Sequence, residues 1–387
     1  MRVLFSSSSG VGHVQPVLPL AIAMRDRGHD VVWATAEDGC EWVRSAGVDT
    51  HVAGTAMGER MAQFAQRWPD VAAMRGEERA EKMFPLLFGA VTARAAFAEL
   101  LELANQWRPD LIVSEAGDFA APVVGAAIGV PQVTHGFGLV VPPERVALAG
   151  EMAADLWSQV GLSPRPFGGQ YDHLYIDIYP PSMQPDDLSY MGRIQRRRPL
   201  SHTGDAGTIA ADVQRVLDGG RPLVYVTFGT LFNVTPAFSA AVAAFDEIRD
   251  VDALVTVGTT GDAGAFGRVP DHVVVERYVP QAAVFDRCAA VVSHAGSGTL
   301  LGALAHGIPQ VCVPQAADQF RNAQATEAAG AGRAVLPGDV TAAAIAHALR
   351  EVLDDATYRV DAARVAKEIE AMPAVDEVVD ALEALVR

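Results

Sequence analysis

The sequence AAVVSHAGSGT, at residues 289–299, passes from an apolar segment into a glycine-rich loop, and a further apolar segment follows at 300–305. We interpret the three parts as a strand, a loop and a helix. Glycines at a helix N-terminus let backbone N–H groups approach an anion closely, and the helix dipole favours negative charge there. His294 and Thr299 add side-chain donors. The pattern therefore predicts a phosphate-binding loop, with a tight strand-to-helix turn as the alternative.

The same strand–loop–helix order continues on both sides of this loop. Apolar runs predict strands at 223–228, 253–257, 273–276, 290–293 and 310–313 in the C-terminal half, and at 3–5, 30–35, 111–114 and 132–134 in the N-terminal half, where a helix is expected at 14–27. Strands that alternate with helices indicate parallel, doubly wound sheets, so the fold class is α/β. Such sheets bind ligands at the carboxyl ends of their strands, and we expect the site in a cleft between two domains.

The domain boundary is predicted near Arg196-Arg197-Arg198-Pro199, where the sequence becomes basic, polar and marked by Pro and Gly. We expect an N-terminal domain at 1–200, a linker at 201–220 and a C-terminal domain at 221–370. A final helix at 371–387 is placed so that it can pack back on the N-terminal domain.

Composition limits the partners and the location. The chain has 387 residues and a net charge of −17, so nucleic acid and anionic membranes are poor partners. Cys40, Cys288 and Cys312 are scattered and have no metal-ligand spacing, and no metal site is expected. The first residues do not resemble a signal peptide, and no run approaches the ~20 apolar residues that span a bilayer. We expect a cytoplasmic monomer or homodimer.

Two further motifs flank the glycine-rich loop: RYVPQ at 277–281 and PQAADQFRN at 314–322. In this order the motifs resemble the donor-binding signature of family 1 nucleotide-sugar glycosyltransferases, which include plant secondary-product enzymes and bacterial antibiotic and macrolide enzymes. The resemblance extends along nearly the whole chain and implies the GT-B fold, with two facing Rossmann-like domains. Tyr278 stands where plant members carry Trp, and Gly298 where they carry Asn, so the chain is more similar to the bacterial branch.

The resemblance implies that the C-terminal domain binds a nucleotide sugar, UDP- or TDP-linked, as a co-substrate and without a further cofactor. The 278–281 element is expected to hold the nucleobase, the 294–299 loop the diphosphate, and the Asp-Gln pair the sugar hydroxyls. Since no lysine follows the glycines, the loop suits a diphosphate that leaves. The predicted donor-binding residues are Thr230, Tyr278, Val279, Gln281, His294, Gly296, Ser297, Gly298, Thr299, Asp318 and Gln319. Capping of the next helix is an alternative role for Asp318.

Asp250-Val251-Asp252 matches the D-x-D pattern of metal-dependent glycosyltransferases. It precedes a predicted strand, which places it at the wrong edge of the sheet. We interpret it as a chance surface match.

The N-terminal loop, residues 6–13, ends in His13 at a predicted helix entrance. Gln15 stands where a dinucleotide fingerprint needs its third glycine, so nicotinamide binding is disfavoured. Imidazole titrates near neutral pH and suits removal of a hydroxyl proton, and the resemblance assigns His13 as that base. Glu115 directly follows a strand and is the preferred partner that orients the ring; Asp118 is the other candidate, with helix capping as its alternative role.

Flexible and aromatic side chains between Met57 and Phe88 suit an apolar acceptor pocket, and ordinary helix packing is the alternative. The predicted acceptor-binding residues are Phe64, Phe84, Phe88 and Phe137.

Together these features predict an inverting, metal-independent glycosyltransferase that glycosylates a hydroxyl of a small apolar natural product, such as a polyketide, macrolide or phenolic. Two alternatives stay open. One is a sugar-nucleotide epimerase of similar fold, which needs no apolar acceptor pocket. The other is a non-catalytic helper protein on the same fold.

Overall fold

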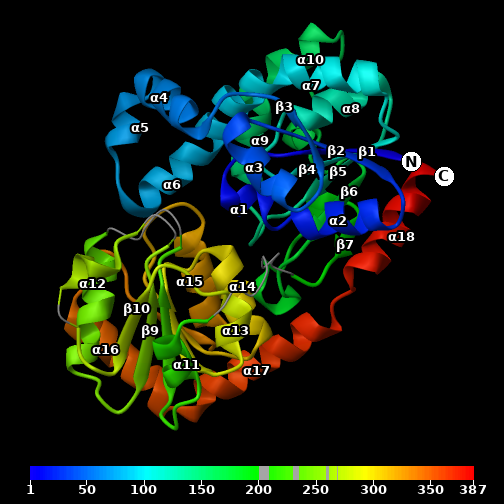
Figure 1. Ribbon diagram of the computed structural model, residues 1–387. Coiled ribbons are helices and arrows are strands. Elements are labelled where there is room, and N and C mark those ends of the chain that lie inside the picture. The colour runs from blue at the N-terminus through cyan, green and yellow to red at the C-terminus, as the bar shows by residue number, and fades with distance from the viewer. Residues whose placement is uncertain (200–208, 230–234, 259–260, 268) are drawn as a thin grey trace. The chain divides into compact units, whose positions relative to one another are not determined.

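The computed structural model describes residues 1–199, 209–229, 235–258, 261–267 and 269–387 (Figure 1). The chain forms two compact units, and each contains one parallel sheet. The first unit consists of Met1–Tyr179, Pro185–His202 and Met372–Arg387, and the second of Pro180–Gln184 and Thr203–Ala371. The predicted α/β class with two sheets of parallel strands is therefore confirmed.

The first unit has a seven-stranded sheet in the order β3-β2-β1-β4-β5-β6-β7. Its strands are β1 (Arg2–Ser6), β2 (Asp30–Thr35), β3 (Asp49–Val52), β4 (Leu111–Glu115), β5 (Gln132–His135), β6 (Leu174–Asp177) and β7 (Ile194–Arg196). Its helices are α1 (Val11–Val14), α2 (Leu18–Asp26), α3 (Glu37–Ser45), α4 (Met57–Arg67), α5 (Pro69–Ala73), α6 (Gly76–Phe84), the π-helix η1 (Pro85–Thr92), α7 (Ala93–Trp107), α8 (Ala121–Ile128), α9 (Pro143–Met152), α10 (Ala154–Gln159), the 3-10 helices η2 (Pro166–Gly169) and η4 (Ser189–Met191), and α18 (Val375–Val386).

The second unit has a six-stranded sheet in the order β10-β9-β8-β11-β12-β13. Its strands are β8 (Leu223–Thr227), β9 (Asp252–Thr256), β10 (Val273–Glu276), β11 (Cys288–Ser293), β12 (Gln310–Cys312) and β13 (Gly332–Ala334). Its helices are α11 (Ala211–Leu217), α12 (Pro236–Ala243), α13 (Gln281–Phe285), α14 (Ser297–Ala305), α15 (Gln319–Ala328), α16 (Ala342–Asp354), α17 (Ala356–Ala371) and the 3-10 helices η3 (Pro181–Met183), η5 (Ala244–Asp246) and η6 (Ala263–Phe266).

Both sheets are covered on both faces, which explains why their central strands are apolar throughout. In β1, Val3 and Phe5 pack in one core with α2 and α18, while Leu4 packs in a second core with η1, α7 and α8. In β8, Val224 and Tyr225 divide in the same way between two cores. Side chains alternate along a strand, so each strand contributes to a core on both sides. Packing on both faces thereby fixes the position of each sheet, and with it the position of its carboxyl edge.

Several elements differ from the sequence prediction. The helix expected at 14–27 is divided into α1 and α2 around Pro16, which has no N–H to continue the helical bonding. The region near Arg196, interpreted as the start of a linker, forms β7, and α11 lies within the expected linker at 201–220. Strands β3, β6, β7 and β13 were not predicted, because most of them are short and polar.

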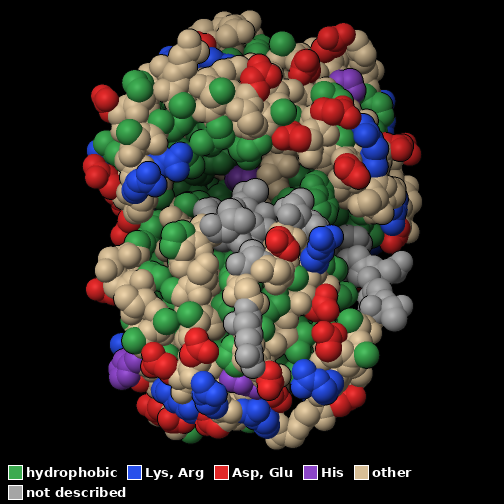
Figure 2. Space-filling model, turned by 60° about the vertical axis from the view of Figure 1, so that its left-hand side comes forward, with side chains coloured by type: hydrophobic (Ala, Val, Ile, Leu, Met, Phe, Trp, Pro, Cys, Tyr) green, Lys and Arg blue, Asp and Glu red, His purple; other side chains and the backbone are tan. Residues whose placement is uncertain are grey.

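The run Gly76–Trp107, which combines α6, η1 and α7, is long and apolar enough to cross a membrane by length and composition alone. The expectation that no run approaches that length is therefore wrong. Its most apolar window is 56% buried within the protein, as in the core helix of a globular domain. On the face shown in Figure 2, acidic and basic side chains are interspersed over the surface.

Candidate active site

The glycine-rich loop lies between β11 and α14, at the carboxyl edge of the second sheet. Helix α14 begins after Gly296, and no side chain caps its N-terminus. Ala295 has a left-handed backbone, with φ of 62°, which is uncommon outside glycine. The loop is held by Asn322, whose Nδ2 donates to the Ala295 carbonyl at 2.9 Å. The first-turn N–H groups of α14 are thus presented at a fixed helix end, as anion binding requires.

Asp318 and Gln319 support this loop. Asp318 Oδ2 accepts hydrogen bonds from Ser297 Oγ at 2.8 Å and from Asn322 Nδ2 at 2.9 Å. The side chain of Asp318 makes no cap hydrogen bond to α15, so the capping alternative is wrong. Gln319 Oε1 accepts from the backbone N–H groups of Gln315 and Ala316. Asn322 has no predicted role in the sequence analysis, although its spacing of four residues from Asp318 places both on one helix face.

His294 packs deep in the loop, with 9% of its surface exposed. Its ring stacks near Phe228, with centroids 6.3 Å apart. A Cβ on Gly229 or Gly296 would approach the His294 ring to 3.0 Å or closer, so both glycines make room for it. Burial lowers the pKa of His294 to about 4, despite the opposing charge of Asp318. The ring is therefore neutral at pH 7 and can donate a hydrogen bond to a phosphate oxygen without carrying charge.

We expect His294 to make the protein less stable in mild acid. The unfolded histidine takes up a proton as the pH falls below about 6.5, whereas the folded one does so only near pH 4. Between these values the unfolded state binds more protons, so stability falls as the pH falls, by roughly 3 kcal/mol in total. The free energy of unfolding, measured with urea at pH 7 and pH 4.5, is compared between the wild type and His294→Gln. A pH dependence equal in both proteins would contradict the assignment.

The predicted nucleobase element lies at the start of α13. The Tyr278 side chain is 56% exposed, which is unusual for a large aromatic residue. Gln281 Nε2 donates to Thr299 Oγ1 at 3.1 Å and so joins this element to the glycine-rich loop. Val279 is buried in the core of the unit, so only its backbone remains for a ligand. Thr230 lies outside the described residues.

Tyr278→Ala is expected to weaken TDP binding about tenfold, because stacking of a base on an aromatic ring contributes ~1–3 kcal/mol. Tyr278→Phe should bind as the wild type does, since the ring face is retained. Isothermal titration calorimetry with TDP compares the three proteins. Equal affinity of Tyr278→Ala and the wild type would show that the base does not stack on this ring.

A second group of site residues lies at the carboxyl edge of the first sheet. His13 follows the loop after β1, and Glu115 ends the neighbouring strand β4. His13 Nδ1 is 3.2 Å from Glu115 Oε2, within ion-pair distance, although the ring is not aligned for a hydrogen bond. Glu115 is fully buried and accepts backbone hydrogen bonds from Ser8 at 3.2 Å and Gly117 at 2.6 Å. The expected pairing of these two residues is present in the structure.

Asp118 does not contact His13. Its Oδ1 accepts from the backbone N–H groups of Ala120 and Ala121 at the start of α8, and its Oδ2 accepts from Ser6 Oγ at 2.5 Å. Burial raises the pKa of the Asp118 carboxyl, although the hydrogen bond from Ser6 acts in the opposite direction. Asp118 is therefore placed as a buried support for the loop and for α8, which is the alternative role predicted for it.

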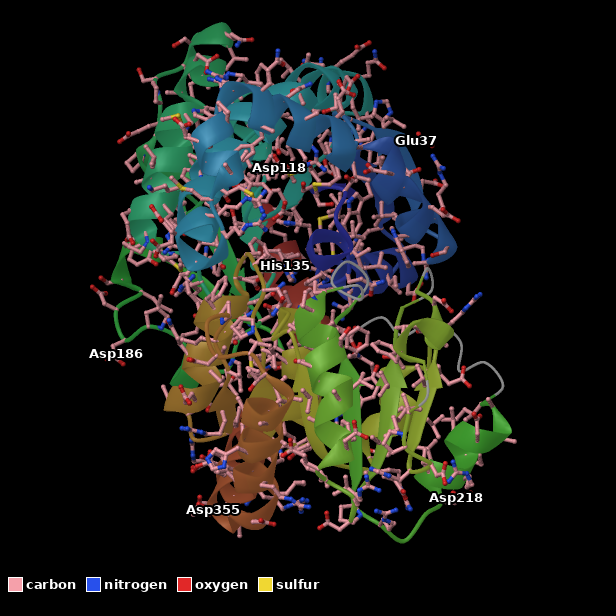
Figure 3. All side chains as sticks on the ribbon, turned by 90° about the vertical axis from the view of Figure 1, so that its left-hand side faces the viewer. Glu37, Asp118, His135, Asp186, Asp218 and Asp355 are labelled. Carbon is pink, nitrogen blue, oxygen red and sulfur yellow. The ribbon has the colours of Figure 1, made fainter. Side chains whose placement is uncertain are left out.

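A second histidine at this edge is His135, which lies beside Glu115 across the β4–β5 pair. Figure 3 shows Asp118 and His135 inside the unit, whereas Glu37 and Asp186 lie at its periphery. Burial and the charge of Arg197 lower the pKa of His135 well below its usual range. Since its ring is fully buried, His135 is not accessible as a base.

Two of the predicted acceptor residues contact His13, and a third packs against one of them. The rings of Phe88 and Phe137 lie 5.1 Å and 5.0 Å from the imidazole, and Phe84 lies 5.0 Å from Phe88. Phe64 differs: it is fully buried in the core beside Trp68, which agrees with the alternative of ordinary helix packing. Helix α4 is amphipathic, and Phe64 lies on its narrow buried face, which packs against the core. Aromatic rings thus border the imidazole of His13, which is accessible, whereas that of His135 is not.

The structure also shows where the two aspartates of the D-x-D match lie. Asp252 begins β9 at the amino edge of the sheet and pairs with Arg221 at 3.3 Å, while Asp250 pairs with Arg350. Asp250 lies on the surface, as expected, whereas Asp252 is buried, so the expectation of a surface match is wrong for Asp252. Among the described residues, no group of three or more His, Cys, Asp or Glu side chains is arranged to hold a metal ion.

Two parallel sheets, each with loops at its carboxyl edge that carry candidate ligand-binding residues, are typical of the class of GT-B glycosyltransferases. Family models described as erythromycin biosynthesis protein CIII-like match residues 22–195 (N-terminal domain) and 242–385 (C-terminal domain). The elloramycin glycosyltransferase ElmGT of Streptomyces olivaceus is 32% identical over 97% of this chain and 94% of its own length. The chain belongs to the EryCIII-like family of antibiotic and macrolide glycosyltransferases.

Solved structures agree with this assignment. The glycosyltransferase SnogD from Streptomyces nogalater has a TM-score of 0.77 and 28% identity, and the match covers 100% of this chain and 99% of that one. The spinosyn rhamnosyltransferase SpnG, complexed with thymidine diphosphate, has a TM-score of 0.79 and 25% identity, with 99% and 100% covered. SpnG has also been solved with the spinosyn aglycone, and that structure has a TM-score of 0.81.

Proposed function

We propose that this protein transfers a sugar from a TDP- or UDP-sugar to a hydroxyl of a small apolar natural product, such as a polyketide, a macrolide or a phenolic. The observation that carries the proposal is the His13–Glu115 pair, at 3.2 Å, with the rings of Phe88 and Phe137 against the imidazole. A base that is oriented by a buried carboxylate and bordered by apolar rings suits an acceptor that is apolar apart from its reactive hydroxyl.

His13 takes the proton of the acceptor hydroxyl. Because Nδ1 faces Glu115, the neutral ring carries its proton on Nδ1, and Nε2 is left to accept the acceptor proton. The Glu115 carboxylate then stabilises the imidazolium that forms.

The second unit stabilises the leaving group. As the acceptor oxygen forms its bond to the anomeric carbon, the bond to the nucleotide diphosphate breaks and negative charge grows on the phosphate oxygens. We propose that the N–H groups at the start of α14 and the neutral His294 receive that charge. One displacement without an enzyme nucleophile inverts the anomeric configuration. Since these donors are all protein groups, we propose that the reaction is metal-independent.

The relatives support both substrates. ElmGT is an elloramycin glycosyltransferase, and SpnG has been crystallised with thymidine diphosphate and with an aglycone. We propose that this chain works in the cytoplasm as a monomer or homodimer, with the nucleotide sugar as co-substrate and no resident cofactor. The net charge of −17 supports the absence of nucleic-acid and membrane partners.

The proposal is tested by mass spectrometry of reactions that contain a TDP- or UDP-sugar and a panel of polyketide, macrolide and phenolic acceptors, with and without chelator. We expect a product heavier by one sugar residue, formed equally in both conditions. A product lost with chelator would contradict the metal-independent mechanism. Hydrolysis or epimerisation of the donor, with no transfer to any acceptor, would contradict the transferase.

A further inference from the structure

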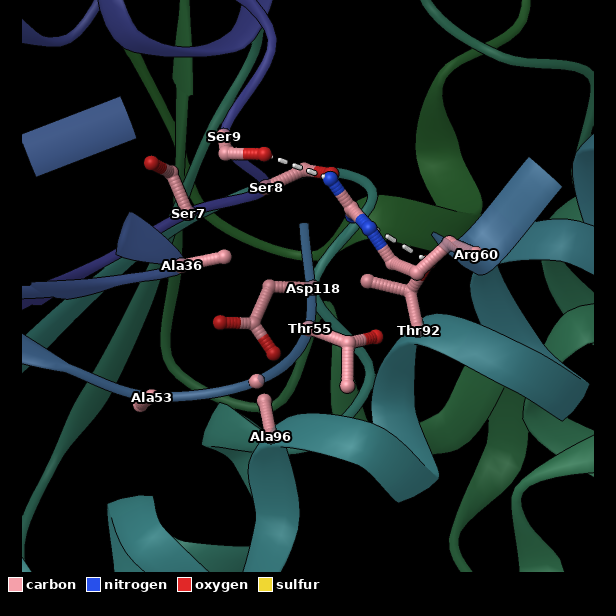
Figure 4. Close-up of a pocket in the computed structure, with 11 residues that line it drawn as sticks. Ser7, Ser8, Ser9, Ala36, Ala53, Thr55, Arg60, Thr92, Ala96 and Asp118 are labelled. Carbon is pink, nitrogen blue, oxygen red and sulfur yellow. Dashed lines mark hydrogen bonds between the residues drawn. The ribbon is translucent and has the colours of Figure 1, made fainter. Parts of the chain in front are cut away.

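Four consecutive serines precede His13, from the end of β1 into the loop, and all four have buried partners. Ser6 Oγ donates to Asp118, and Ser7 Oγ accepts from Trp33 Nε1 at 3.0 Å. Ser8 and Ser9 both accept from the guanidinium of Arg60 on α4. Figure 4 shows Arg60 reaching the two serines from the opposite side of a small cavity. A single side chain thus holds the middle of the loop that carries the base.

Arg60 is itself buried, with 2% of its surface exposed. Among the residues that the structure describes, no carboxylate lies within ion-pair distance of its guanidinium. Its partners are neutral hydroxyls, namely Ser8, Ser9 at 2.6 Å and the more distant Thr92 at 3.4 Å on η1. A buried cation without an ion pair is costly, because hydroxyls replace water only in part. Such a cation is retained where its charge has a use.

Arg60 is connected to Glu115 through one residue of the serine loop. Ser8 joins the two residues, since its hydroxyl accepts from Arg60 and its backbone N–H donates to Glu115 Oε1 at 3.2 Å. Burial lowers the pKa of Arg60, while the charges of Asp38 and Glu115 act in the opposite direction. The guanidinium therefore interacts electrostatically with both carboxyl groups. The other titratable groups near Glu115 are His13, Asp118, His135 and Tyr175.

We propose that Arg60 is a positioning residue for the proton transfer, which holds Glu115 in place beside His13 through the Ser8 loop. The inference rests on the proposed function of His13 as base. Arg60 does not contact the acceptor, because the cavity it borders has a volume of about 20 Å³. That volume holds about one water molecule, far less than the ~300 Å³ or more of a ligand pocket.

The first test is a double-mutant cycle of Arg60→Gln and Glu115→Gln in the transfer reaction. We expect Arg60→Gln to lower kcat about 10- to 100-fold, as misplacement of a catalytic group does, with the KM for the nucleotide sugar unchanged. In the Glu115→Gln background the same change should have little further effect. Arg60→Lys should restore part of kcat. Full additivity of the two changes would show that Arg60 supports only the fold and would overturn the proposal.

The second test does not depend on activity, so it separates this proposal from the proposed function. In ¹⁵N-labelled protein at alkaline pH, the ring nitrogens of His13, assigned by their loss in His13→Gln, report which nitrogen carries the proton. We expect the Nδ1–H form in the wild type and a shift toward Nε2–H in Arg60→Gln and Glu115→Gln alike. An Arg60→Gln protein with the wild-type tautomer would contradict the coupling, whatever the transfer assay shows.

Two further variants guard against a folding defect. Arg67→Gln, on the same helix but over the ring of Trp68 at 4.8 Å, is the matched control and should behave as the wild type. Ser8→Ala removes the hydroxyl that joins Arg60 to the loop and leaves the cation in place. If Arg60→Gln does not fold, Ser8→Ala should still shift the His13 tautomer in the same direction, and an unshifted tautomer there would overturn the proposal.

Discussion

His13→Ala is expected to lower kcat for sugar transfer by about 10²- to 10⁴-fold, the usual contribution of a general base. The acceptor hydroxyl is a weak nucleophile until its proton is removed, and His13 is the accessible imidazole held by a buried carboxylate. TDP affinity should not change, because the predicted donor residues belong to the other unit. Single-turnover measurements with saturating donor and acceptor give the chemical step directly.

The matched control for this change is His51→Ala. His51 is an exposed histidine of the same unit, on the edge strand β3, so its loss removes an imidazole away from the site. We expect wild-type turnover. If His13→Ala retained most of its turnover while it remained folded and bound TDP normally, another group would have to be the base.

His294→Ala is expected to lower kcat/KM by about 10²- to 10³-fold, as loss of one preorganised donor to a developing negative charge does. The neutral, buried ring is well suited to this role, because its hydrogen bond to the departing diphosphate strengthens as charge grows. Initial rates at low nucleotide-sugar concentration measure the effect. The loss should be larger than the loss in TDP affinity, since the interaction is strongest in the transition state.

His347→Ala provides the control in the second unit, because the His347 side chain is 79% exposed on α16. We expect no change in its rate. A His294→Ala protein whose only defect is a lower melting temperature would place His294 in the packing of the loop against Phe228 and not in catalysis.

The fold was predicted well where strands are apolar and buried on both faces. Strands β2 and β10 occupy the predicted ranges 30–35 and 273–276, and β11 contains the predicted strand 290–293. Strand β3, with sequence DTHV, has no apolar pattern, so its place at the sheet edge is determined by pairing with β2 and not by its own residues. Tertiary pairing of this kind is invisible to local periodicity.

The proximity of candidate site residues was predicted where those residues follow neighbouring strands. His13 and Glu115 come after β1 and at the end of β4, which pair directly, so their proximity follows from the order of the strands. Arg60 was not predicted, because it lies on an amphipathic helix among other charged residues and nothing in the sequence marks it as buried. The role of Asn322 in holding the Ala295 carbonyl likewise depends on a contact between helix α15 and the loop after β11.

A single displacement by the acceptor oxygen is tested most directly by the anomeric configuration of the product. A nucleotide sugar of known configuration is converted completely with an accepted aglycone, and the H1–H2 coupling of the purified glycoside is measured by NMR. The proposed mechanism predicts a product with the configuration opposite to that of the donor. A product with the configuration of the donor would contradict it, since retention does not result from one in-line displacement assisted by His13.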